Sequence, residues 1–351
     1  MAKSSADHSN LSAVARLAGV SIATASRVIN GNGPAAAKTH EKVMVAARKL
    51  GYVPDPRFRA MGQRNAARDG HIGLILNSTS KAMLVATPFY GRLFWSIEQA
   101  ASEAGRHILL TTLEDDAEEY LPRFARDMQV DGAIVIDHVP LDTVKRLDQL
   151  VPVVMVNAPG DDLDIPRVMP NETETVRVGL RHLRKLGHRR VAFFDIADND
   201  NRPHRQRVKE FKQATALSDD WWEHTRCEVL PARQHSLVDE CKICLKKWMG
   251  EKNPPTAIFC ACDLYAEAFA KAAESLGIGV PSQISLLGID DDVCAIYCRP
   301  ALTTIRQPFA AMGQLAVRMI LDRIEQGADY SHPSVSLNVE LVERESTGPA
   351  K

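Results

Sequence analysis

The stretch LSAVARLAGVSIATASRVIN, residues 11–30, decides the first structural expectation. Apolar residues recur at helical spacing over residues 11–18, and Gly19 is placed to end that helix. Ser21 is a favourable N-cap for a second helix over residues 22–30. Two short helices joined by a three- or four-residue turn containing glycine are typical of a helix-turn-helix. The apolar face predicted for the first helix consists of Leu11, Val14, Leu17 and Ala18.

A third helix is expected after Gly31-Asn-Gly-Pro34, which interrupts the chain. Its apolar side is predicted to consist of Val43, Ala46, Ala47 and Leu50. The three helices bury enough apolar surface for a small domain, which we assign to residues 1–54. Residues 55–70 then form a linker to the rest of the chain.

The basic residues are concentrated at this end of the chain. Residues 1–70 carry eleven Lys and Arg against four Asp and Glu, a net charge of +7. Because the whole chain has a net charge of −1, residues 71–351 carry −8. A basic segment on an acidic body is the charge distribution of a nucleic-acid binder. The alternative is a solvated terminal segment with no partner.

Three segments carry a resemblance to a known family. Residues 11–30, Lys38-Thr-His-Glu-Lys-Val43 and Leu50-Gly-Tyr-Val-Pro54 resemble the opening of the lactose-repressor (LacI/GalR) family of bacterial transcription regulators. The resemblance implies that the second helix lies in the major groove of DNA. A three-helix cap without a role in DNA binding is the alternative.

The residue types in the second helix suit contact with DNA. Ser21 and Thr24 can donate to phosphates, which position a helix without reading sequence. Arg27 can donate two hydrogen bonds to a guanine edge, a contact worth about 1–3 kcal/mol of discrimination. The family resemblance implies that Ile22 and Ala23 face the operator beside Arg27. Neither side chain forms hydrogen bonds, so the base sequence of the operator is not predicted.

The linker is expected to contribute a second contact with DNA. Pro54-Asp55-Pro56 is a favourable helix start, and residues 57–64 supply one or two basic turns. The resemblance implies a hinge helix that forms on the operator and inserts an apolar side chain, here Met61, into the minor groove. A plain basic tether is the alternative. The residues assigned to DNA contact are Ser21, Ile22, Ala23, Thr24, Ser26, Arg27, Asn30, Arg57 and Met61.

The body, residues 71–351, is predicted to be an α/β structure. Seven apolar, strand-like runs alternate with helical stretches, which indicates parallel sheets with crossover helices. These runs are residues 72–76, 108–110, 133–136, 153–156, 191–194, 257–259 and 284–287. The family resemblance continues to the C-terminus and implies a two-lobed core like that of periplasmic binding proteins. An effector would bind between the lobes, beyond the carboxyl ends of the strands.

Several positions match the effector site of the family. Phe89 and Tyr90 lie in Thr87-Pro-Phe-Tyr90, which is similar to the family's Asn-Pro-Phe-Phe. Cys262 stands where a ligand-binding Asn is usual. Asn171-Glu172 stands where Asp-Asn is common, which is a second departure from the family pattern. The residues assigned to effector binding are Phe89, Tyr90, Arg207, Cys262, Asp263 and Asp290. Ordinary roles are the alternatives: core packing for the aromatic residues, and an ion pair for Arg207 and Asp290.

Other functional classes find little support. The chain has no phosphate-binding loop, no nucleophile elbow and no His-Glu-x-x-His, so we expect no enzyme and no cofactor. No apolar run is long enough to cross a membrane, and residues 1–10 lack a signal peptide, so we expect a cytoplasmic protein. The seven cysteines are expected to be reduced thiols, with thiolate metal ligation or redox sensing as the alternative.

Together these observations predict a sequence-specific DNA-binding repressor of catabolic genes. A homodimer would bind a pseudo-palindromic operator, and a small carbohydrate or similar metabolite would change its affinity. Two other classes remain open: a cytosolic solute-binding module that does not bind DNA, and an α/β enzyme.

Overall fold

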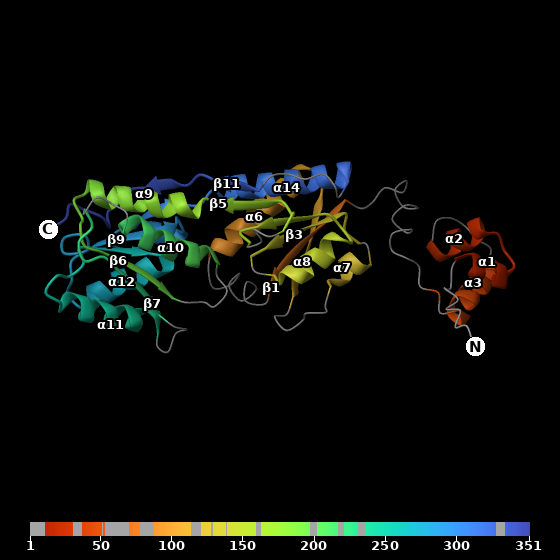
Figure 1. Cartoon of the computed structure of the whole chain (residues 1–351), viewed down its shortest axis with the longest axis horizontal. Helices are drawn as coiled ribbons and strands as arrows, with labels where there is room; N and C mark the ends of the chain where they lie inside the picture. The colour runs from red at the N-terminus through yellow and green to blue at the C-terminus, as the bar shows by residue number, and fades with distance from the viewer. Residues whose placement is uncertain are drawn as a thin grey trace, which may run out of the picture.

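The computed structural model describes most of the chain. The described ranges are 11–30, 37–50, 52, 70–77, 88–113, 121–127, 129–137, 139–158, 163–196, 202–216, 221–230, 236–327 and 334–351. They form a bundle of three helices and two α/β lobes (Figure 1). The linker residues 55–69, with Arg57 and Met61, lie outside the described residues, so the predicted hinge helix stays a prediction.

The bundle confirms the three predicted N-terminal helices. They are α1 (Leu11–Ala18), α2 (Ile22–Asn30) and α3 (Ala37–Lys49). Gly19 ends α1 with φ of +66°, a conformation that glycine adopts without steric cost. The buried residues of the bundle are Val14, Ala15, Ala18, Ala25, Val28, Val43 and Ala46.

The predicted apolar faces are wrong at Leu50, which follows α3 and is 36% exposed, and at Leu17 of α1. Leu17 is 53% exposed, whereas Ala15 is buried. The core-facing positions 11, 14, 15 and 18 follow the i, i+3, i+4, i+7 spacing of a helix stripe. Leu17, six residues after Leu11, points away from that stripe because each residue turns the helix by about 100°.

The first lobe is built on a six-stranded sheet in which every described pair of neighbours is parallel. Its strand order is β11-β5-β4-β3-β1-β2. The strands are β1 (His71–Asn77), β2 (His107–Leu113), β3 (Gly132–Ile136), β4 (Val153–Val156), β5 (Arg167–Pro170) and β11 (Val335–Leu337). Its helices are α6 (Pro88–Glu103), α7 (Arg123–Arg126), α8 (Leu141–Asp148) and α14 (Phe309–Gln326).

The second lobe repeats this plan, with the strand order β12-β10-β9-β8-β6-β7. Its edge strand β12 (Glu340–Val342) is antiparallel to β10 (Thr303–Arg306). The other strands are β6 (Val191–Ile196), β7 (Arg226–Leu230), β8 (Ala257–Cys260) and β9 (Ser285–Asp290). Its helices are α9 (Glu172–Lys185), α10 (Arg202–Ala216), α11 (Leu237–Met249), α12 (Asp263–Ser275) and α13 (Val293–Tyr297).

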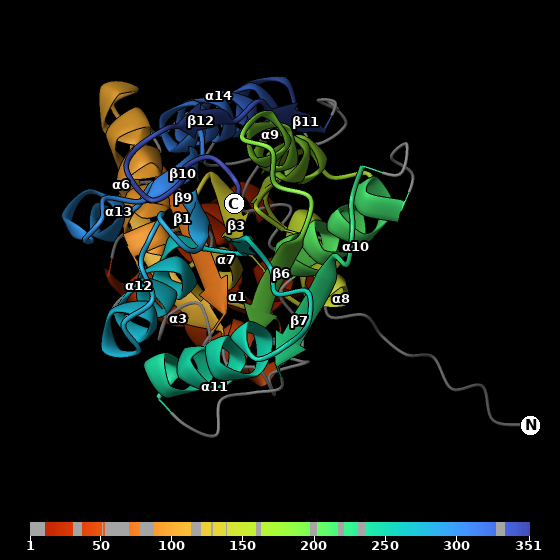
Figure 2. The ribbon, with the colours of Figure 1, turned by 90° about the vertical axis from the view of Figure 1, so that its left-hand side faces the viewer.

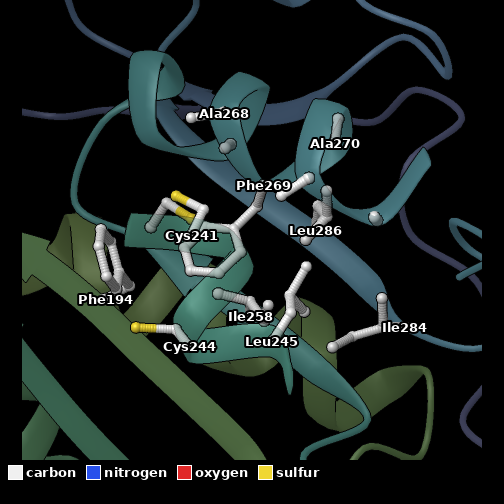
Figure 3. Packing of buried hydrophobic residues seen from close by; sticks show 14 of the residues in the cluster. Phe194, Cys241, Cys244, Leu245, Ile258, Ala268, Phe269, Ala270, Ile284 and Leu286 are labelled. Atoms are coloured by element: carbon white, nitrogen blue, oxygen red, sulfur yellow. The ribbon is translucent and has the colours of Figure 1, made fainter. Parts of the chain in front are cut away.

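Continuous apolar runs explain the central strands. Every residue of β3, β4 and β8 is buried, as expected where helices cover both faces of a parallel sheet. A Cβ at Gly179 of α9 would overlap the ring of Phe259 in β8, so this glycine lets the helix approach the sheet. In Figure 3, Cys241 and Cys244 of α11 lie among the apolar side chains that pack against Phe269.

The chain passes between the lobes after β5, again after β10 and once more after β11. The first lobe therefore consists of two separate stretches, residues 71–170 and 309–337. At the first two crossings a strand of one lobe leads directly into a helix of the other, so the polar residues there stand at the junction of the lobes.

Candidate DNA-reading and effector sites

The amino end of α2 is an exposed, capped helix terminus. The Ser21 hydroxyl accepts a hydrogen bond from the backbone N–H of Thr24 at 3.1 Å, as predicted for an N-cap. It also lies 2.8 Å from the Thr24 hydroxyl, within hydrogen-bond distance. Ile22 is 53% exposed and Ala23 is also exposed. A helix terminus of this kind binds phosphate through its free N–H groups and its dipole.

The rest of α2 separates a buried side from an outward side. Ala25 and Val28 are buried against the bundle, whereas Arg27 is exposed and Ser26 is partly exposed. Arg27 is therefore free to reach a base edge, as its predicted role requires. The side chain of Asn30, like Arg57 and Met61, lies outside the described residues, so its predicted contact is not placed.

The two aromatic residues of the predicted effector site differ in their surroundings. Phe89 meets the rings of Tyr90 and Phe309 edge-on, at 5.2 and 5.1 Å between centroids, and packs on the first-lobe core. The Tyr90 hydroxyl donates a hydrogen bond to the carboxylate of Asp137, which directly follows β3. The structure thus gives Phe89 a packing role and places Tyr90 at the carboxyl end of a strand.

Arg207 is buried and already paired. Its Nε and Nη2 donate to the two oxygens of Glu172, the latter at 2.9 Å, and its Nη1 donates to the carbonyl of Ala261 at 2.6 Å. Burial alone lowers the pKa of Arg207, but the Glu172 carboxylate outweighs burial and raises the pKa above its ordinary value. Arg207 therefore stays charged and braces the second lobe, with two N–H donors of its guanidinium left for other contacts.

Asp290 ends β9 and is 5% exposed, with φ of +113°. Its Oδ1 has no hydrogen-bond partner among the described residues. Burial raises the pKa of this carboxyl well above its ordinary value, although the charge of Arg207 opposes the shift. A buried polar atom without a partner is costly, so Oδ1 is a strong candidate for contact with a ligand.

Cys262 and Asp263 follow β8 but face different surroundings. Asp263 accepts from the Thr304 hydroxyl at 2.5 Å and from the backbone N–H of Asp292 at 2.8 Å. Burial raises the pKa of Asp263 to about 8. Both of its oxygens are thus engaged inside the second lobe, which gives it a bracing role. Cys262 is partly exposed, and burial raises its pKa well above the ordinary value, so it stays a neutral thiol.

Two further candidates at the junction were not predicted from the sequence. Asn157 directly follows β4, and Gln307 follows β10; they are 4% and 2% exposed. The Oδ1 of Asn157 and both side-chain polar atoms of Gln307 lack partners among the residues that the structure describes. Their position one residue beyond a strand was the available signal, since ligands of parallel sheets bind at carboxyl ends.

A contact between a partly exposed histidine and a buried aspartate was not predicted either. His204 of α10 lies 2.8 Å from the carboxylate of Asp195 in β6, and the same oxygen accepts from the N–H of Ile196. Asp195 lies near the carboxyl end of β6, and Cys262 follows β8, the parallel strand beside it. The described part of the second lobe therefore combines carboxylates, an imidazole, a thiol and an arginine at one end of its sheet.

The cysteines give no sign of metal binding or disulfide formation. All seven are free thiols, and the described residues contain no group of three or more potential metal ligands. Burial raises the pKa of Cys244 to about 11, and the pKa of Cys241 also rises. These thiols behave as small apolar residues of the core.

Two family models match separate parts of the chain. The model described as bacterial regulatory proteins, lacI family, matches residues 10–55, and that of the periplasmic binding protein-like domain matches residues 180–347. The HTH-type transcriptional regulator DegA of Bacillus subtilis (strain 168) is 30% identical over 96% of this chain and 97% of its own length. The chain belongs to the lacI family of bacterial regulatory proteins.

This lacI-family chain is also 28% identical to the HTH-type transcriptional repressor PurR of Photobacterium profundum, over 95% of this chain and 97% of that protein. The solved structure of the transcriptional regulator CelR–cellobiose complex matches with a TM-score of 0.67 and 26% identity, covering 97% of this chain and 100% of that one. The predicted family, the two-lobed fold and the role in transcription regulation are thereby confirmed.

Within the described residues, no single helix is long and apolar enough to cross a membrane. One bent pair, α1 with α2 at 103°, meets the length and composition limits. Both of these helices contribute buried residues to the core of the N-terminal bundle, which accounts for their apolar composition.

Proposed function

We propose that this lacI-family regulator is a homodimeric repressor of catabolic genes, working in the cytoplasm on a pseudo-palindromic operator. A small carbohydrate or similar metabolite, bound between the lobes, changes its operator affinity. Residues 1–54 bind DNA, residues 55–70 form the hinge and linker, and residues 71–351 bind the effector and the second subunit. The exposed amino end of α2, capped by Ser21, carries the proposal, because it suits phosphate binding and presents Arg27 to solvent.

The DNA-binding part is tested by selecting duplexes from a random library with the purified full chain. We expect a recurring palindromic sequence. The logarithm of the affinity should fall linearly with that of salt concentration, with a slope of about −0.9 for each neutralised phosphate. Failure to enrich any sequence would contradict the proposal and favour a solute-binding module without a role on DNA.

The reading role of Arg27 has a matched control. Arg27→Ala should relax the preference at one base pair of each half-site by about 1–3 kcal/mol, as the loss of a guanine contact does. Arg16 of α1 is also exposed but stands outside the reading helix, so Arg16→Ala should leave every base preference unchanged. An unchanged preference in Arg27→Ala would remove this residue from the set that reads bases.

Dimer formation is supported by apolar residues on one side of the body. Trp95 of α6 is 64% exposed and Tyr297 of α13 is 73% exposed, with Val293 and Ile296 exposed beside Tyr297. Figure 2 shows α6 and α13 on the same side of the molecule. Exposed apolar patches of this kind mark protein interfaces. Trp95→Lys should give monomers in analytical ultracentrifugation, whereas Ile243→Lys on α11, also at an exposed apolar residue, should leave the dimer intact.

Effector binding is supported by the unpartnered polar atoms at the junction of the lobes. Asp290, Asn157 and Gln307 offer acceptors and one amide donor, which suit the hydroxyl groups of a carbohydrate. The similar CelR structure is named as a complex with cellobiose.

A thermal-shift screen with mono- and disaccharides, cellobiose included, tests this site. A ligand at 100 times its Kd should stabilise the folded chain by about 2.7 kcal/mol. Asp290→Asn should abolish the shift, whereas Asp142→Asn on α8, at an exposed carboxylate, should preserve it. A thermal shift that survives Asp290→Asn would mean that the ligand binds elsewhere. A thermal shift produced by nucleosides but not by saccharides would mean that the effector belongs to a different ligand class.

A further inference from the structure

Arg92 of α6 reaches from the first lobe to the turn that follows β9 in the second lobe. Its Nη1 donates to the carbonyl oxygens of Asp290 at 3.1 Å and Asp291 at 2.6 Å, and lies 3.6 Å from Oδ1 of Asp292. The guanidinium also lies over the ring of Phe309, 4.6 Å from its centroid. One side chain therefore joins both lobes at the second crossing of the chain.

The turn that Arg92 holds is fixed within the second lobe. The Asp291 carboxylate accepts from Arg306 at 2.7 Å and from Arg344 at 2.6 Å. The backbone N–H of Asp292 donates to Asp263. Since the turn is tied to its own lobe from several sides, it moves with that lobe. The contacts of Arg92 therefore form and break with the relative position of the two lobes.

Asp290 links this turn to the effector site. Its carbonyl accepts from Arg92, while its buried carboxyl has an oxygen without a partner among the described residues. The residue has φ of +113° and Asp291 has φ of +54°, both in a region that non-glycine residues rarely occupy. A ligand that forms a hydrogen bond with the Asp290 carboxyl contacts the same strained residue whose backbone carbonyl accepts from Arg92.

We propose that Arg92 couples occupancy of the effector site to the arrangement of the lobes. The inference rests on the proposed function, and it makes Arg92 a positioning residue that does not touch the ligand. Hydrogen bonds from a charged guanidinium to two carbonyls favour the lobe arrangement that allows them. A ligand shifts the equilibrium between two arrangements only through contacts that differ between them, and the Asp290 turn supplies such a difference.

Hydrogen exchange of the full chain tests the inference without any ligand. In Arg92→Gln, amides of residues 290–292 and of α6 should exchange about tenfold faster, which corresponds to a loss of about 1.4 kcal/mol. The control is Arg106→Gln, because Arg106 pairs with Asp131 at 3.4 Å inside the first lobe and is similarly half-buried. Exchange in Arg92→Gln that stays within twofold of the parent chain would overturn the inference.

Asp292→Asn separates the two kinds of contact that Arg92 makes. This variant removes the ion pair but keeps both backbone carbonyls, so exchange should rise by less than threefold. Arg92→Lys retains the positive charge but not the planar guanidinium, and should fall between the parent chain and Arg92→Gln. An Asp292→Asn effect equal to that of Arg92→Gln would overturn the role given to the carbonyls.

Coupling itself is measured with the duplex selected from the random library. Arg92→Gln should change its Kd by fivefold or more, and Arg106→Gln by less than twofold. Faster exchange with unchanged duplex affinity would overturn the coupling. If no duplex is selected, the proposed function fails, while the exchange comparison still decides whether Arg92 holds the lobes.

Discussion

Among the described residues, each lobe buries one arginine against a carboxylate, but the two ion pairs lie at opposite ends of their sheets. In the second lobe, Arg207 pairs with Glu172 and holds a carbonyl that directly follows β8. In the first lobe, Arg323 of α14 donates to Asp148 at 2.8 Å and to the carbonyl of Val153, where β4 begins. Only the second-lobe pair therefore stands at the end of the sheet where parallel strands bind ligands.

This difference predicts that the strand ends of the two lobes are not equally well ordered. The carboxyl ends of the second sheet are ordered by charged contacts before any ligand arrives, which lowers the cost of binding there. In the described part of the first lobe, the corresponding ion pair lies at the amino end of the sheet instead. We expect the strand ends of the second lobe to be more rigid than those of the first, and the following variants test this difference.

The largest effect is expected from Glu172→Gln. It leaves the buried Arg207 without its carboxylate, and breaking a buried ion pair costs about 3–5 kcal/mol of unfolding free energy. Urea unfolding followed by tryptophan fluorescence measures the change. The double variant Glu172→Gln with Arg207→Met removes both charges and should recover part of the loss. A double variant no more stable than Glu172→Gln would show that the unpaired charge is not the cause.

The next effect depends on pH and arises in the second lobe. Burial lowers the pKa of His188 to about 4, with the carbonyl of Gly348 opposing and His182 adding to the shift. The unfolded chain binds this proton near pH 6.5, and the folded chain binds it only near pH 4. The contribution of His188 to the free energy of unfolding is therefore fully present above pH 6.5 and is lost as the pH falls from 6.5 towards 4. At pH 5 the loss from His188 should be about 2 kcal/mol.

Unfolding at pH 7 and pH 5 in His188→Gln measures this contribution. The variant should lose about 2 kcal/mol less on acidification than the parent chain. His107→Gln, at an exposed position of β2 in the first lobe, serves as the control and should keep the full pH dependence. An equal slope in His188→Gln would assign the acid sensitivity to other groups.

A smaller effect is expected from Asp148→Asn in the first lobe. Asp148 is 22% exposed, and Arg323 keeps its contact with the carbonyl of Val153 when the charge is removed. Because water can reach this pair, the loss should be about 1–2 kcal/mol, below that of Glu172→Gln. Equal losses in the two variants, measured by urea unfolding, would abolish the distinction between the lobes.

The smallest effect is expected from Tyr90→Phe, which removes one hydrogen bond to Asp137. A single hydrogen bond contributes about 0.5–1.5 kcal/mol. The expected loss is about 0.5–1 kcal/mol, with a larger change in the thermal shift produced by an active carbohydrate. A loss above 2 kcal/mol would mean that the first-lobe strand ends are as firmly braced as those of the second lobe.

Sequence patterns predicted the central strands because buried parallel strands are continuous runs of apolar residues. The five strands without such runs, β5, β7, β10, β11 and β12, were missed. They are short and partly polar, and several lie at sheet edges, where tertiary pairing decides their conformation. The error at Leu17 has a similar origin, since the position of the partner helices selected Ala15 instead.

Sequence patterns suggest single residues of the candidate site but not the contacts between them. The effector-binding roles of Arg207 and Asp290 stay predictions, and the partner of Arg207 is Glu172, which lies 35 residues earlier in the chain. Asn157 and Gln307 are neutral amides with no distinctive motif, so only the strand boundaries locate them. The reach of Arg92 across the junction depends on how the lobes are arranged, which no local pattern encodes.

The three crossings between the lobes have a consequence for synthesis on the ribosome. The first lobe begins early, yet its core needs Phe309, Met312 and Ile320 of α14, and its sheet needs β11. By the time these residues leave the ribosomal tunnel, nearly all of the second lobe has been made. The lobe whose translation starts first therefore completes its fold among the last, and a premature stop codon before residue 335 leaves it without its edge strand.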